Sequence, residues 1–189
     1  MKKIVIILAI AVAVVILIFA IICFVIPVLI LGGFMPPAPN YTKVDKYLKA
    51  NIDTLSYVAD ALFELDYDSI SIRENSQLRE EEKNSMKVSR EYLVYETIPI
   101  PDELLGHIEA LHKSGISVIS CGRDSIGFTM WSSMDESRGI IYSRTGEKAD
   151  DIIREDVQLI EVKQLSEENW YYYVHNFEKA KARNPHLFQ

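Results

Sequence analysis

Cysteine and histidine are both scarce in this sequence. Of 189 residues, two are cysteines, Cys23 and Cys121, and four are histidines. A single thiol in the polar part of the chain excludes an intradomain disulfide and the cysteine clusters of structural zinc sites. His107 and His112 lie on one expected helix, but their spacing of five differs from the spacing of four that places two histidines on one metal. We therefore expect no metal and no cofactor.

Charged residues are absent from Ile4 to Leu31. A helix rises about 1.5 Å per residue, so about 20 apolar residues cross a hydrocarbon core of about 30 Å. A cleaved signal peptide has an apolar stretch of about 7–15 residues, which is much shorter than this one. We expect residues 4–31 to be an uncleaved, single-pass transmembrane anchor, preceded by a basic flank at 1–3 and followed by a Pro/Gly-rich linker at 32–40.

Basic residues are in the minority outside the anchor. Without Lys2 and Lys3, the chain has 18 basic and 27 acidic residues, a net charge of −9. Such a surface is poor for nucleic acid, whose binding depends on cations that neutralise phosphates. The lysines before the anchor favour a cytoplasmic N-terminus and an extracytoplasmic domain. The lysine start and the isoleucine-rich anchor suggest a bacterial protein of the plasma membrane.

The rest of the chain predicts one α+β domain at 41–178 and a polar tail at 179–189. Short polar connectors between consecutive strands predict an antiparallel β-meander, and two amphipathic helices have apolar stripes suited to cover one face of it. The segment 75–90 is polar and fits either an exposed helix or a mobile excursion. The expected helices are 41–65 and 101–114, and the expected strands are 67–74, 91–98, 116–120, 125–131, 138–144, 157–164 and 169–174.

The first of these helices has two interpretations. Its apolar positions keep an unbroken spacing of four and three, with Asn51 in the series, as in a short coiled coil. The flanking positions carry few complementary charges, which favours a helix that lies on its own sheet. We expect packing within the domain, and the alternative is a membrane-proximal homodimer through 41–65.

The last strand, NWYYYVHNF, carries the candidate binding residues. Side chains alternate between the faces of a strand, so Trp170, Tyr172 and Val174 are expected to face the helices. Tyr171, Tyr173 and His175 then form an aromatic stripe on the open face, which Trp131 and Tyr142 join if the strands align. Tyrosine and tryptophan are enriched at protein interfaces because they combine a large area with a polar end.

We therefore expect a non-enzymatic interaction module that is tethered at the membrane and binds a protein or peptide partner. Two alternatives stay open. One is a membrane-anchored hydrolase or thiol enzyme in which His175 activates Cys121, because a thiolate nucleophile needs a nearby base. The other is a structural protein that dimerises next to the membrane.

Overall fold

A computed structural model of the chain describes residues 37–91, 94–146 and 158–183. Apart from Pro37, these residues belong to one compact unit, Ala38–Gln189. The expected basic flank, the anchor at 4–31 and most of the linker lie outside the described residues. Within the described ranges, no helix is both long and apolar enough to cross a membrane.

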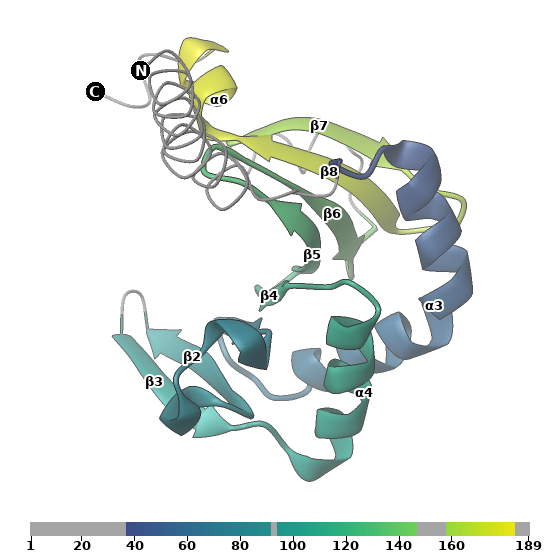
Figure 1. Cartoon of the computed structure of the whole chain (residues 1–189). Coiled ribbons are helices and arrows are strands. Elements are labelled where there is room, and N and C mark those ends of the chain that lie inside the picture. Colours follow the sequence, from purple (N-terminus) through teal and green to yellow (C-terminus); the bar gives the residue numbers. More distant parts are fainter. Residues whose placement is uncertain (1–36, 92–93, 147–157, 184–189) are drawn as a thin grey trace, which may run out of the picture. The chain divides into compact units, whose positions relative to one another are not determined.

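The domain is an eight-stranded antiparallel sheet with helices packed against it, which confirms the predicted α+β class (Figure 1). The strands lie in the order β3-β2-β1-β4-β5-β6-β8-β7. Their bounds are β1 Ser69–Arg73, β2 Ser85–Glu91, β3 Val94–Pro99, β4 Val118–Cys121, β5 Ser125–Ser132, β6 Glu136–Ser143, β7 Leu159–Gln164 and β8 Trp170–Asn176. The helices are α3 Tyr41–Phe63, α4 Asp102–Lys113 and α6 Phe177–Arg183, and two 3-10 turns, Asn75–Gln77 and Glu80–Glu82, precede β2.

Both expected helices form, and they lie together on one side of the sheet (Figure 1). Asn40 caps α3 by accepting a hydrogen bond from the Lys43 amide at 3.0 Å, which satisfies one of the donors that a helix start leaves open. Pro101 directly precedes α4, whose first turn is acidic and whose last turn is basic, as the helix dipole favours. The apolar faces of α3 and α4 share one core with alternate residues of the strands.

The apolar stripe of α3 is buried within the domain. Val44, Leu48, Leu55 and Val58 are all fully buried in the main core. Asn51, the candidate register-setting residue of a coiled coil, donates to the carbonyl oxygen of Tyr47 in its own helix at 2.9 Å. This confirms the packing that we expected for the helix. The stripe on which a dimer through 41–65 would depend is already covered by the sheet.

Three features depart from the sequence prediction. The segment 75–90, expected to be an exposed helix or a mobile excursion, contains most of β2, which holds Met86 and Val88 in the core between charged and polar neighbours. The expected polar tail begins within α6, where Ala180 is buried. The sheet is not a simple meander, because β8 lies between β6 and β7. An interior place suits β8, since five successive residues from Trp170 are buried, whereas β7 carries the charged residues of an edge.

Candidate functional site

Strand β8 separates its side chains as the alternation predicts. Trp170, Tyr172 and Val174 belong to the main core with the helices. The indole of Trp170 lies against two neighbouring rings on the same face, with centroid distances of 4.7 Å to Tyr142 and 6.0 Å to Phe128. These three residues of β8 hold the sheet against α3.

Tyr171 and Tyr173 lie on the other face, where an exposed stripe was expected. They are instead 5% and 7% exposed and form a second apolar cluster with Ile141, Leu159 and Val162. The interior position of β8 explains part of this burial, because Ile141 of β6 stands opposite Tyr171 and Val162 of β7 stands opposite Tyr173. Removing either tyrosine would disturb this cluster as well as any binding surface.

Trp131 and Tyr142 do not join this stripe, and Tyr142 stands opposite Trp170 on the helix side. A register shift in β5 between Thr129 and Trp131 changes the alternation, so that Trp131 stands opposite Arg138. Arg138 in turn stands opposite Val174, which faces the helices. Paired residues of antiparallel strands point to the same face, so the bulge moves Trp131 to the helix side of the sheet. A bulge of this kind leaves little trace in the sequence.

The face opposite α3 and α4 contains a hollow of about 240 Å³, which we call the β4–β8 hollow. Half-buried His175 and the buried Tyr173 form one wall, and the Tyr173 hydroxyl lies 2.8 Å from Oγ1 of Thr129. Small residues leave the space, namely Ser120 of β4 and the alternating Ser125, Gly127 and Thr129 of β5, and the sequence carries this signal in SIGFT. The lining consists of Ser120, Ser125, Gly127, Thr129, Ser137, Ile141, Leu159, Tyr173 and His175.

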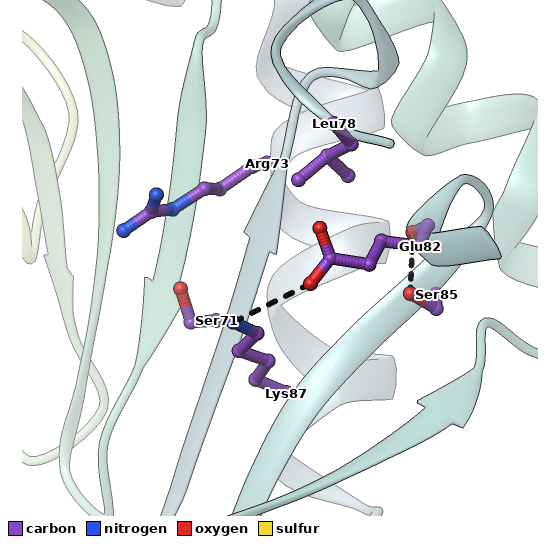
Figure 2. A pocket seen from close by; sticks show the side chains of 6 residues that line it. All are labelled: Ser71, Arg73, Leu78, Glu82, Ser85 and Lys87. Carbon is purple, nitrogen blue, oxygen red and sulfur yellow. Dashed lines mark hydrogen bonds and ion pairs between the residues drawn. The ribbon is translucent and has the colours of Figure 1, made fainter. Parts of the chain in front are cut away.

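A second, smaller hollow lies beside β1 and β2, and we call it the Arg73 hollow (Figure 2). Lys87 forms a long ion pair with Glu82 at 3.8 Å, and the Ser85 hydroxyl donates to the Glu82 carbonyl oxygen. The exposed Arg73 side chain is directed away from this pair in Figure 2. Among the described residues, no carboxylate pairs with Arg73. The lining consists of Ser71, Arg73, Leu78, Glu82, Ser85 and Lys87.

The sheet register joins the two hollows on one face. Ser71 in the Arg73 hollow stands opposite Ser120 in the β4–β8 hollow. A second row of paired residues runs from Arg73 through Val118, Thr129 and Gly139 to Tyr173. Cationic, hydroxyl and aromatic side chains therefore follow one another across the strands of a single surface.

Cys121 and His175 do not form a catalytic pair in this arrangement. Cys121 aligns across the sheet with Ile126, Tyr142 and Trp170, whereas His175 is five residues further along β8 and on the other face. Cys121 is 5% exposed, and its thiol donates to the Gly122 carbonyl oxygen at 3.3 Å. Burial raises the pKa of this thiol to about 12, and the charge of Arg144 offsets only part of the rise.

We expect Cys121 to react slowly with iodoacetamide in the folded protein. The pKa is raised, so the thiolate fraction should increase about tenfold per pH unit beyond pH 9 instead of levelling off there as it does for an ordinary thiol. The rate is measured by mass spectrometry in a Cys23→Ser background, with the protein in urea as the reference for an accessible thiol. A rate at pH 7 that equals the unfolded reference would contradict this expectation and restore the thiol-enzyme hypothesis.

Among the described residues, no group of three or more His, Cys, Asp or Glu side chains could hold a metal ion. Comparison with known proteins gave no match to a protein-family model, to a curated protein or to a solved structure.

Proposed function

We propose that this protein is a non-enzymatic binding module, tethered at the membrane by residues 4–31, whose sheet face takes a protein or peptide partner. The β4–β8 hollow is the observation that supports this proposal. Its hydroxyl groups can donate and accept hydrogen bonds, and Ile141, Leu159 and Tyr173 supply an apolar wall. Side chains of a partner find both kinds of contact there. The charge of residues 1–3 favours an extracytoplasmic domain, so partners in the envelope are proposed.

The alternatives have less support from the same geometry. A thiol enzyme requires Cys121 and a base on one surface, and the register places Cys121 and His175 on opposite faces. A dimer through 41–65 requires the apolar stripe of α3, and the stripe is buried in the main core. A binding face opposite the helices requires no rearrangement of either element.

The proposal is tested by site-specific photocrosslinking in intact membranes. Benzoylphenylalanine at Ser120, an exposed residue of the hollow, is expected to give a discrete crosslinked product that benzoylphenylalanine at Asp53 does not give. Asp53 is also exposed but lies on α3, on the other side of the sheet. The position dependence distinguishes a binding face from incidental collisions at the membrane.

A blocking variant makes this test specific. Gly127→Leu places a large side chain in the hollow, and the nearest atom to its Cβ is the Ser120 carbonyl oxygen at 3.8 Å, so the backbone has room for the change. We expect Gly127→Leu to remove the product from Ser120 while the melting temperature remains within a few degrees. Equal products from Ser120 and Asp53, or a product from Ser120 that persists in Gly127→Leu, would refute a partner in this hollow.

A further inference from the structure

The chemistry of the partner follows from Arg73, if the proposed binding function holds. The domain carries an excess of acidic residues, yet Arg73 has no carboxylate partner among the described residues. Glu82 lies in the same hollow, but it is 3.8 Å from Lys87, and the Arg73 side chain is directed away from this pair (Figure 2). An arginine in such a setting can bind a carboxylate through two parallel hydrogen bonds. Arg73 is therefore suited to an anionic group on a partner.

The distance between the two hollows determines how long a peptide segment must be to occupy both. Arg73 on β1 is three strands from β6, and neighbouring strands are about 4.8 Å apart, which gives about 14 Å between them. An extended chain advances about 3.3 Å per residue, so about four residues cover this distance. The intervening positions, Ser71, Ser120 and Gly127, are small and leave a path across the strands.

We propose that the partner is an extended protein segment with an acidic side chain about four residues from a large apolar one. Arg73 binds the carboxylate, and the apolar side chain enters the β4–β8 hollow against Ile141 and Tyr173. Between them, the serine and threonine hydroxyls of β4 and β5 bond to the backbone of the segment. The two hollows thereby specify two positions of one ligand.

The test uses the full-length protein in detergent micelles and fluorescein-labelled pentapeptide pools. The first pool is Asp-X-X-X-Phe, in which X is Ser, Thr or Gly, and the matched pools replace its Asp by Asn or its Phe by Ala. We expect the first pool to bind about tenfold more tightly than either matched pool, because each loses one anchor. Arg73→Gln should abolish the Asp preference, and Lys46→Gln, an equal charge change on α3, should preserve it.

Each outcome decides one of the two proposals. An Asp preference that depends on Arg73 and weakens with salt supports the acidic segment. Equal binding of the Asp and Asn pools that Gly127→Leu abolishes overturns the acidic requirement but keeps the sheet face as a binding surface. Absence of binding by all pools, together with a crosslinked product from Ser120, overturns the extended segment while the proposed function stands. An Asp preference that survives Arg73→Gln assigns the carboxylate to another site and refutes the inference.

Discussion

Replacing Gly139 by alanine is expected to lower the free energy of unfolding by about 3 kcal/mol or more, since overpacked sites typically lose 1–3 kcal/mol and backbone has little freedom to move. A Cβ at Gly139 would lie 2.0 Å from the Phe128 carbonyl oxygen and 3.0 Å from the Phe128 carbonyl carbon and the Thr129 Cα. These are backbone atoms of β5, next to the register shift that follows Thr129. Relief would require β5 and β6 to separate in the middle of the sheet.

Gly127→Ala is the matched control for this prediction. Gly127 is on the same strand pair, but the nearest atom to its Cβ is 3.8 Å away, at the Ser120 carbonyl oxygen. We expect a change within about 0.5 kcal/mol for this variant, as for most substitutions that meet no special feature. Urea unfolding in mild detergent, followed by tryptophan fluorescence, gives both values. A loss below about 1 kcal/mol for Gly139→Ala would mean that the bulge yields easily to strain.

The sequence was sufficient to predict the elements whose signals agree with one another. The helix at 101–114 has an acidic start, an apolar face and a basic end, and α4 occupies Asp102–Lys113. The apolar positions of 41–65 predicted which face of α3 is buried. Strand β2 was missed because its two core residues, Met86 and Val88, are surrounded by Lys87, Ser89 and Arg90 in a polar stretch. A strand of such polar composition is specified by its partners β1 and β3 more than by its own sequence.

In the candidate site, too, the properties of a single strand could be predicted, and those that depend on the whole sheet could not. Period-two alternation correctly separated Trp170 and Tyr172 from Tyr171 and Tyr173, because this property belongs to a single strand. The burial of Tyr171 and Tyr173 depends on the order of the strands, which is a property of the whole sheet. The face of Trp131 depends on the bulge in β5. The Arg73 hollow joins residues of β1 and β2 with Leu78 and Glu82 from the segment of the two 3-10 turns, so sequence spacing gave no reason to group its residues.

Replacing Phe128 by alanine is the second large effect, and we expect a loss of about 3–5 kcal/mol of unfolding free energy, the usual range for a buried phenylalanine. Phe128 is fully buried in β5, near the centre of the sheet, and stands opposite Ile119 on one side and Ile140 on the other. Its ring stacks on Trp170 at a centroid distance of 6.0 Å. Strands on both sides hold this position in place, so the cavity would collapse only partly.

Phe177→Ala is the matched control, because Phe177 at the start of α6 is 40% exposed and its removal leaves no enclosed cavity. That change should cost about 1–2 kcal/mol, less than Phe128→Ala, because only part of the Phe177 ring is buried. Both variants are unfolded in urea, and the native fluorescence of Trp170 should also shift in Phe128→Ala as its stacking partner is lost. Equal losses for the two variants would contradict the central place of β5 in the core. If the Phe128→Ala variant remains folded but the pairing of β4 with β5 is weakened, the crosslinked product from Ser120 should decrease too. Phe128 pairs with Ile119, the residue next to Ser120 on β4.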